Sequence, residues 1–143
     1  MRMSRSVLAL AVMFAAGYAA GQFTRVDAAA QAAPRVFELR TYYTHPGKLG
    51  DLNTRFRDHT LRLFEKHGMT NVGYWVPQDD PAHGNTLVYV ISHASREQAK
   101  KNWAAFGADP DWVKVKTASE ANGKIVEKVD SVYMDAIDYS PIK

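Results

Sequence analysis

Polar and apolar side chains alternate with a period of two over residues 36–42. This spacing predicts a β-strand, in which successive side chains point to opposite faces of a sheet. We expect the face that carries Phe37 and Leu39 to pack against helices. The opposite face carries a more reactive set of side chains, namely Glu38, Arg40 and Tyr42.

The rest of the pattern predicts two βαβ halves. The predicted elements are a strand at 36–42, a helix at 48–67, strands at 71–76 and 86–91 joined by a hairpin loop, a helix that Ser95 and Gln98 cap, a short helix after residues 109–111 and a strand at 124–137. This order indicates an α+β, ferredoxin-like βαββαβ fold, with a four-stranded antiparallel sheet and its helices on one face.

Residues 86–91 are apolar at nearly every position, as expected of a strand that is buried on both faces. The helices of one chain can cover only one face of the sheet. An uncovered apolar face of this size usually binds a partner. We therefore expect a homodimer in which two chains pack sheet to sheet.

Residues 1–33 have the layout of a secretory signal. Two arginines precede an uncharged run at residues 7–20, and three alanines precede Gln31. The run is shorter than the roughly 20 apolar residues of a membrane-spanning helix. We assign residues 1–33 to a signal peptide or an N-terminal membrane anchor and residues 34–143 to one exported domain, periplasmic or secreted. The domain would contact a membrane only through an uncleaved N-terminal segment.

Composition and charge exclude several classes of function. The 143 residues include no cysteine, which excludes disulfides, thiolate metal sites and a cysteine nucleophile. Of the formal net charge of +3, residues 1–33 supply +2 (three arginines and one aspartate), which leaves +1 for the domain. A nucleic-acid-binding domain would show a basic stripe, so we predict no nucleic-acid partner.

The five histidines do not form a metal-binding pattern. His59 and His67 lie eight positions apart on the predicted helix, whereas a helical zinc pair needs a spacing of four. We predict no metal site. His59 lies at the margin of the apolar stripe of this helix and is the histidine that we assign to a candidate pocket.

We predict a cavity at the dimer interface, bounded by the polar face of the first strand. Second-strand aromatics and Tyr89 would form its walls, and the register that decides between Tyr74 and Trp75 is left open. Two interpretations also stay open. Glu38 and Arg40 form a structural ion-pair network, because an unpaired buried charge is costly, or Arg40 binds an anionic or carbonyl ligand. The candidate ligand-binding residues are Glu38, Arg40, Tyr42, His59, Tyr74, Trp75 and Tyr89.

Five short segments resemble those of the NIPSNAP family, in the same order along the chain. They are residues 37–42 (FELRTY), 46–49 (PGKL), 66–68 (KHG), 72–75 (VGYW) and 109–112 (DPDW). The resemblance implies a dimeric α/β barrel of the ferredoxin-like kind. It implies little about function, because most bacterial members have no assigned activity. The wider structural superfamily includes small monooxygenases and haem-degrading enzymes.

Two functional hypotheses follow. The first is an exported, non-catalytic module that binds a small apolar or anionic ligand, or a protein, as a dimer. The alternative is a small cofactor-independent monooxygenase, or a haem-handling protein, that uses the dimer cavity. We favour the first because the sequence has no strong acid–base pair, nucleophile elbow, phosphate loop or dinucleotide fingerprint. No cofactor is required by the sequence, and haem enters only by superfamily analogy.

Export predicts a processed N-terminus. N-terminal sequencing of the mature protein should begin near Gln31, because the small side chains before it form a signal-peptidase site. A protein that is recovered from the cytosol with Met1 in place would contradict this prediction.

Overall fold

The computed structural model describes residues 34–143, and the predicted export segment, residues 1–33, lies outside the described residues. Among residues 34–143 no helix is long and apolar enough to cross a membrane.

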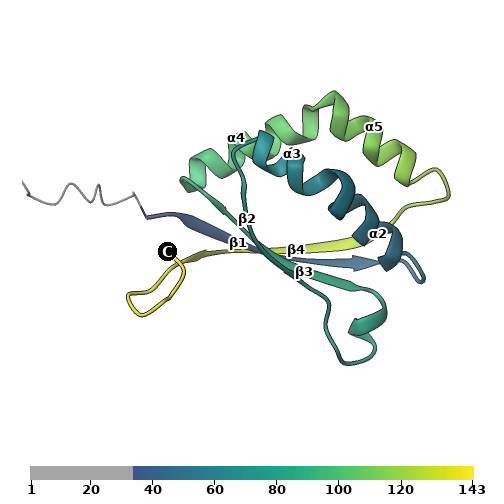
Figure 1. The fold of residues 1–143 in the computed structure, drawn as a ribbon, viewed down its shortest axis with the longest axis horizontal. Coiled ribbons are helices and arrows are strands. Elements are labelled where there is room, and N and C mark those ends of the chain that lie inside the picture. The colour runs from purple at the N-terminus through teal and green to yellow at the C-terminus, as the bar shows by residue number, and fades with distance from the viewer. Residues whose placement is uncertain (1–33) are drawn as a thin grey trace, which may run out of the picture. The chain divides into compact units, whose positions relative to one another are not determined.

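Four strands form one antiparallel sheet in the order β2-β3-β1-β4 (Figure 1). The strands are β1 (Val36–Thr44), β2 (Thr70–Trp75), β3 (Thr86–His93) and β4 (Val126–Asp135). A short 3₁₀ turn, η2 (Ala82–Gly84), lies in the hairpin loop between β2 and β3. β1 is central because it pairs with both β3 and β4, and the predicted sheet is confirmed.

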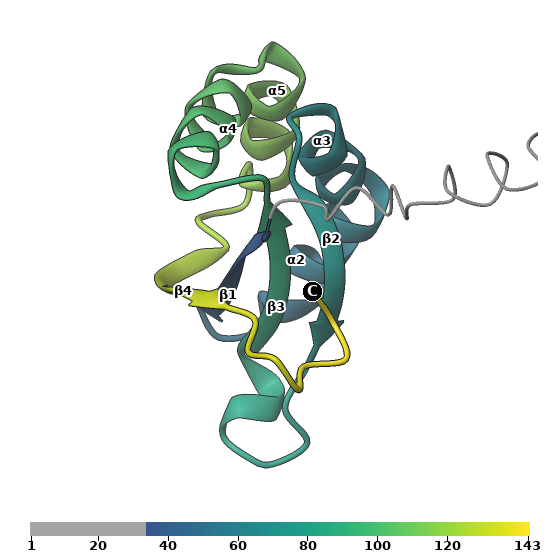
Figure 2. The ribbon, with the colours of Figure 1, turned by 90° about the vertical axis from the view of Figure 1, so that its left-hand side faces the viewer.

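Among residues 34–143, the α-helices and the π-helical segment lie on one face of this sheet, above the strands in Figure 1 and seen from one end in Figure 2. They are α2 (Leu49–Arg55), the π-helical segment η1 (Phe56–Thr60), α3 (Leu61–Lys66), α4 (Arg96–Ala108) and α5 (Pro110–Ser119). The predicted ferredoxin-like α+β fold is confirmed. Within the described part of the chain no helix covers the other face of the sheet, and we call that side the bare face.

Helix ends follow the capping signals of the sequence. The Ser95 side chain accepts a hydrogen bond from the Gln98 backbone N–H at 3.0 Å, at the start of α4. Asp109 ends α4 and caps α5 through the Asp111 N–H at 2.8 Å. Pro110 fits the first turn of α5, where its missing N–H costs nothing. One residue, Asp109, thus sets the angle between two helices.

The predicted helix over residues 48–67 is interrupted by one wider π turn. Between α2 and α3 the backbone N–H of Leu61 bonds to the Phe56 carbonyl, five residues earlier. The Thr60 hydroxyl donates to the Arg55 carbonyl at 3.2 Å, which occupies an acceptor that the wider turn would otherwise leave free. The extra residue in this turn allows Arg55, Phe56 and Thr60 all to be buried. Such π turns are frequent at functional sites.

Aromatic side chains fill the space between the sheet and the helices. Tyr89 on β3 has no exposed surface, and the ring of Phe56 lies 5.2 Å from it. Phe64 contacts Tyr89 at 6.0 Å and Phe106 of α4 at 5.0 Å between ring centroids. Edge-to-face and tilted pairs of this kind favour one mutual arrangement of the rings. The core therefore holds helices of both βαβ halves against the same strand.

The two faces of β1 point opposite to the expectation that Phe37 and Leu39 pack against the helices. Arg40 pairs in register with Tyr89, and Tyr42 with Leu87 of the core, so the polar face of β1 meets the helices. Phe37 and Leu39 lie on the bare face instead. The alternation fixes which residues share a face, but not which face the helices cover. Buried hydrogen bonds that Glu38 accepts from β3, α4 and β4 hold β1 in this orientation.

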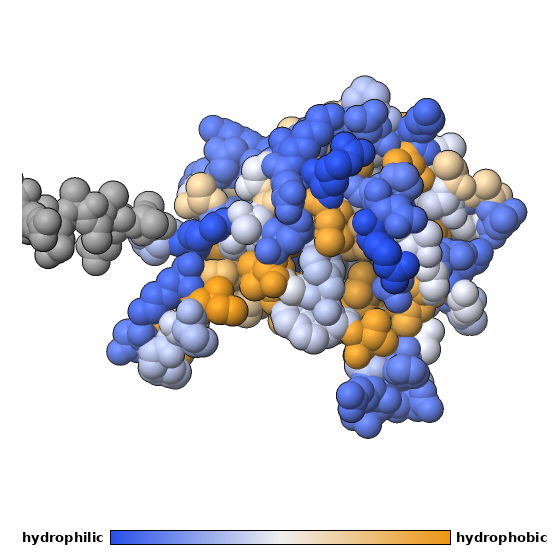
Figure 3. Space-filling model, in the orientation of Figure 1, coloured by the Kyte–Doolittle hydropathy of each residue, from blue (hydrophilic) through white to orange (hydrophobic). Residues whose placement is uncertain are grey.

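The bare face is apolar. Trp75 and Val132 are each 55% exposed there, and the indole of Trp75 lies across Gly73, where no side chain stands in its way. The C-terminal tail lies on this side, and Phe37 lines a shallow pocket of 270 Å³ with Ile137 and other tail residues. Apolar side chains also reach the surface in a band across the lower half of Figure 3, below the hydrophilic helices.

Candidate functional site

Glu38 on β1 is fully buried and its carboxylate accepts four hydrogen bonds. One oxygen accepts from Arg40 at 2.6 Å and from the Ser131 hydroxyl of β4 at 2.7 Å. The other accepts from the indole N–H of Trp103 on α4 at 2.7 Å and from Nε2 of His93 on β3 at 3.0 Å. Both oxygens are therefore saturated, and neither is free to bind a ligand.

These contacts keep Glu38 ionised. Burial alone would raise the pKa of Glu38, but the hydrogen bonds from His93, Ser131, Trp103 and Arg40 outweigh it and lower the pKa from 4.5 to about 2. The other ring nitrogen of His93 faces the amide nitrogen of Asn102 at 3.4 Å.

The structure brings five of the seven predicted site residues together and leaves two apart. Glu38 and Arg40 belong to the hydrogen-bonded network, and the guanidinium of Arg40 stacks on Trp103 at 4.2 Å. Tyr74 stacks on Tyr89 inside the core, with ring centroids 5.3 Å apart. Tyr42 joins these two groups, because its ring centroid lies 5.5 Å from the guanidinium of Arg40 and 5.3 Å from the ring centroid of Tyr89. His59 lies apart in a groove between helices, and Trp75 lies on the bare face. The predicted single cavity on the bare face is therefore wrong, because the polar face of β1 meets the helices and only Trp75 of the seven lies on the bare face.

A cavity of about 310 Å³, which we call the chamber, opens between the helices and β4. Its walls are largely aromatic, and charged side chains gather among them. The lining residues are Tyr42, Arg55, Phe56, Thr60, Phe64, Phe106, Trp112, Lys116, Glu120, Lys124, Val126 and Val129. The charged residues of this lining are Arg55, Lys116, Lys124 and Glu120, so the net charge of the chamber lining is positive. Apolar walls with a few polar groups are typical of small-molecule sites.

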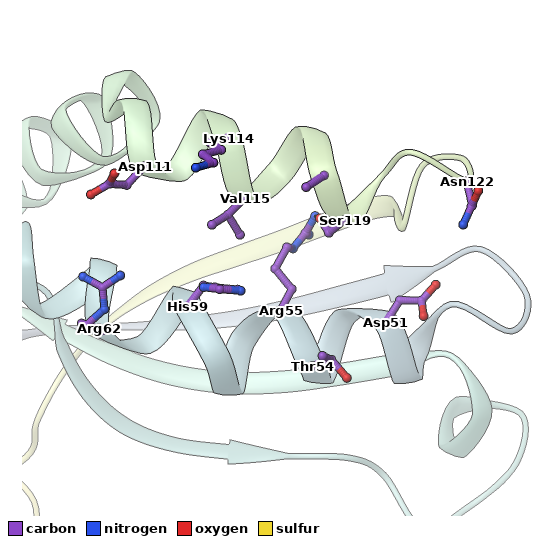
Figure 4. Close-up of a pocket in the computed structure, with 11 residues that line it drawn as sticks. Asp51, Thr54, Arg55, His59, Arg62, Asp111, Lys114, Val115, Ser119 and Asn122 are labelled. Atoms are coloured by element: carbon purple, nitrogen blue, oxygen red, sulfur yellow. The ribbon is translucent and has the colours of Figure 1, made fainter.

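A larger groove of about 610 Å³ lies between the α2–η1–α3 helix and α5. Figure 4 shows Arg55, His59 and Arg62 rising from the first helix toward α5, which carries Lys114 and Asp111 on the facing side. His59 and Arg62 are exposed here. The groove is thus a charged surface feature, in contrast to the aromatic chamber.

Arg55 lines both the chamber and the groove. Its side chain is 3% exposed, and its Nη1 donates to Glu120 and to the Ser119 hydroxyl, each at 3.2 Å. Its Nε has no hydrogen-bond partner among residues 34–143. The guanidinium also lies 5.4 Å from the ring of Trp112. Arg55 is therefore a buried cation with unused donor capacity at the junction of two cavities.

Sequence reasoning missed Arg55. Its spacing from Asp51 suggests a surface ion pair, but in the structure Asp51 pairs with Lys48 and Arg55 turns inward. The available signal was its position three residues after the buried Leu52, which places it on the apolar side of the helix. The π turn, which brings Thr60 to the same side, leaves no signal of comparable strength in the sequence.

The candidate site is a poor fit to haem. Of the side chains that ligate haem iron, the chamber lining contains only a tyrosine, Tyr42, and no histidine or methionine. Among the described residues no three histidine, aspartate or glutamate side chains gather where they could hold a metal ion.

The sequence model of the NIPSNAP family matches residues 37–141. The chain belongs to the NIPSNAP family. Solved structures agree with this assignment. A NIPSNAP family protein of unknown function from Agrobacterium tumefaciens strain C58 is 21% identical, with a TM-score of 0.66 over 78% of this chain and 96% of that one.

Two further solved structures extend the comparison of this NIPSNAP domain. An uncharacterized NIPSNAP-like domain protein from Burkholderia xenovorans is 16% identical, with a TM-score of 0.66 over 76% of this chain and 90% of that one. A monooxygenase of Streptomyces coelicolor in complex with nanaomycin D is 15% identical, with a TM-score of 0.54 over 78% and 95% of the two chains. At such identities the likeness is one of fold. No curated protein matches the chain significantly.

The buried Glu38 predicts a specific loss of stability in acid. Because its pKa lies below the ordinary value of 4.5, its contribution is present above pH 4.5 and is lost as the pH falls toward 2. The shift corresponds to about 3 kcal/mol. Urea unfolding of Glu38→Gln between pH 2 and 7 should show lower stability than the wild type at neutral pH and a smaller loss in acid. The exposed Glu97→Gln on α4 should keep the wild-type slope, and an unchanged slope in Glu38→Gln would contradict the assignment.

Proposed function

We propose that this NIPSNAP domain binds a small ligand with an apolar, largely aromatic body in the chamber between the helices and β4. The observation that carries the proposal is a cavity of about 310 Å³ with aromatic walls and a buried, incompletely paired arginine at its edge. Ligand pockets commonly measure about 300–1,000 Å³, so the chamber suits a body of one or two rings.

The chemistry of the lining supports binding more than catalysis. The lining has no histidine, and its one carboxylate, that of Glu120, is paired with Arg55. General acid–base catalysis needs a group that is free to exchange a proton near the working pH. The monooxygenase of Streptomyces coelicolor shares the fold with this domain, and no residue of the chamber favours an oxygenase reaction over binding.

The same proposal places the domain in a homodimer outside the cytoplasm. Support for the dimer comes from the bare face, where Trp75 and Val132 expose more than half of their surface beside other apolar side chains. Leaving large apolar side chains in water costs about 1.5–3 kcal/mol each, which a second sheet would recover. Support for export comes from the signal-like sequence of residues 1–33.

Blocking the chamber should abolish binding of a neutral aromatic probe. N-phenyl-1-naphthylamine, whose fluorescence rises in apolar surroundings, should bind the full-length protein with about one equivalent per chain. Val129→Trp should remove this binding, because Val129 lines the chamber and is already 38% exposed, so the larger side chain enters the cavity without breaking the core.

The matched control is Val113→Trp on α5. Val113 is 51% exposed and lines neither the chamber nor the groove, so this variant should bind the probe like the wild type. Wild-type binding that survives in Val129→Trp would show that the probe binds elsewhere and would refute the proposed site.

A charge on the bare face should break the dimer. Light scattering on the wild-type protein should give twice the chain mass, and Val132→Arg should give the mass of one chain with unchanged circular dichroism. Val132 contributes little to the folded protomer because it is 55% exposed, so its replacement should act on association alone. The comparably exposed Val113→Arg on α5 should remain dimeric. A wild-type protein that is monomeric at micromolar concentration would overturn the dimer.

A further inference from the structure

We propose that the ligand is an aromatic or other apolar carboxylate, and that Arg55 binds its carboxylate group in place of Glu120. This inference rests on the proposed function of the chamber and adds the chemical class of the ligand. Arg55 is a binding residue in this proposal, and the apolar body of the ligand occupies the chamber.

The pairing of Arg55 is too weak for its burial. A buried charge is costly unless its hydrogen-bonding capacity is met, and a guanidinium offers five donors in a planar fork. Arg55 makes one contact with Glu120 and one with Ser119, both at 3.2 Å and both through Nη1. Its buried Nε has no partner among the described residues. A carboxylate that approaches from the chamber could accept from this second donor.

Glu120 is a replaceable partner. It lies at the C-terminal end of α5, where the helix dipole disfavours a negative charge. Its side chain is 21% exposed, so the Glu120 carboxylate can rotate out into the solvent when another carboxylate binds Arg55. The groove side of Arg55 gives this exchange access to solvent. Departure of Glu120 therefore frees Nη1 as a further donor for the ligand carboxylate, in addition to the unpartnered Nε.

The remaining charges of the chamber favour an anion. Lys116 and Lys124 line it, and neither forms an ion pair within residues 34–143. Once Glu120 no longer pairs with Arg55, the chamber is lined by three cations, Arg55, Lys116 and Lys124, that are unpaired among the described residues. Tyr42, Phe56 and Trp112 supply flat apolar surface for the body of the ligand, and the guanidinium orients its charged end.

The test compares two probes of nearly equal shape, 2-naphthoic acid and its neutral amide, 2-naphthamide. Calorimetric titration of the full-length protein at pH 7 and low salt should show that the carboxylate binds about 10- to 100-fold more tightly than the amide, because a charge-assisted bond to a buried guanidinium exceeds a neutral one. Equal affinities in the wild type would overturn the assignment of Arg55.

Two variants examine Arg55 directly. Arg55→Met should bring the affinity for naphthoate down to that for naphthamide and leave the amide nearly unchanged. Arg57→Met is the matched control, since Arg57 is exposed two residues along the same helix and lines neither the chamber nor the groove. It should keep the preference for the carboxylate, and loss of the preference in Arg57→Met as well would refute a specific role of Arg55.

Glu120→Gln gives a second test that keeps the arginine and does not depend on the folding of Arg55→Met. Removing the competing carboxylate should strengthen naphthoate binding several-fold and leave naphthamide unchanged. Weaker naphthoate binding in Glu120→Gln would contradict the exchange.

Failure of the proposed function looks different, because neither probe would then bind or both would bind Val129→Trp as well. If both bind equally and Val129→Trp blocks both, only the carboxylate assignment fails.

Discussion

The buried carboxylate of Glu38 can stay ionised only while β1, β3, β4 and α4 keep their present positions. Each of these elements supplies one of the four hydrogen-bond donors to Glu38. A buried carboxylate that loses a donor is destabilised, because the hydrogen bond no longer compensates for its desolvation. A register shift of one residue in β1 would turn Glu38 away from His93, Trp103 and Ser131, the donors on the other three elements. The network therefore fixes which face of the sheet meets the helices, and with it the position of the chamber.

A second buried carboxylate holds the helices together at the far end of the same layer. Asp109 caps α5 and accepts from Lys66 at 2.7 Å and His67 at 2.6 Å, at the end of α3. Hydrogen bonds from Lys66 and His67 hold the pKa of Asp109 well below its usual range, so this tie persists in acid. At the other end of α5 the corresponding tie is the Arg55–Glu120 pair, with a longer contact of 3.2 Å. The chamber lies beside the longer contact, the Arg55–Glu120 pair, which an incoming anion can replace more easily than the contacts of Asp109.

The two surfaces that are suited to bind a partner or a ligand, the bare face and the chamber, lie apart in this domain. The bare face is apolar and suits a second sheet, whereas the chamber has apolar walls with a positive balance and suits a small anion with a flat body. Each lies on its own side of the sheet, so that an interface on one side does not cover the opening on the other. The NIPSNAP relatives and the Streptomyces coelicolor monooxygenase share the sheet-and-helix frame, but function depends on which side chains line the space that this frame leaves.

The sequence alone determined the order of the elements, the antiparallel sheet and the caps at Ser95 and Asp109, because all of these depend on local periodicity and on residues close in the chain. It also placed Glu38 and Arg40 on one face of a strand, and the structure decided that they pair. Tertiary structure decided the rest. Period two cannot say which face of β1 is buried, and that choice came from His93, Trp103 and Ser131, which lie 55, 65 and 93 residues away from Glu38. It also decided the site, since Arg55 becomes a candidate ligand-binding group only through its contact with Glu120, 65 residues further along the chain.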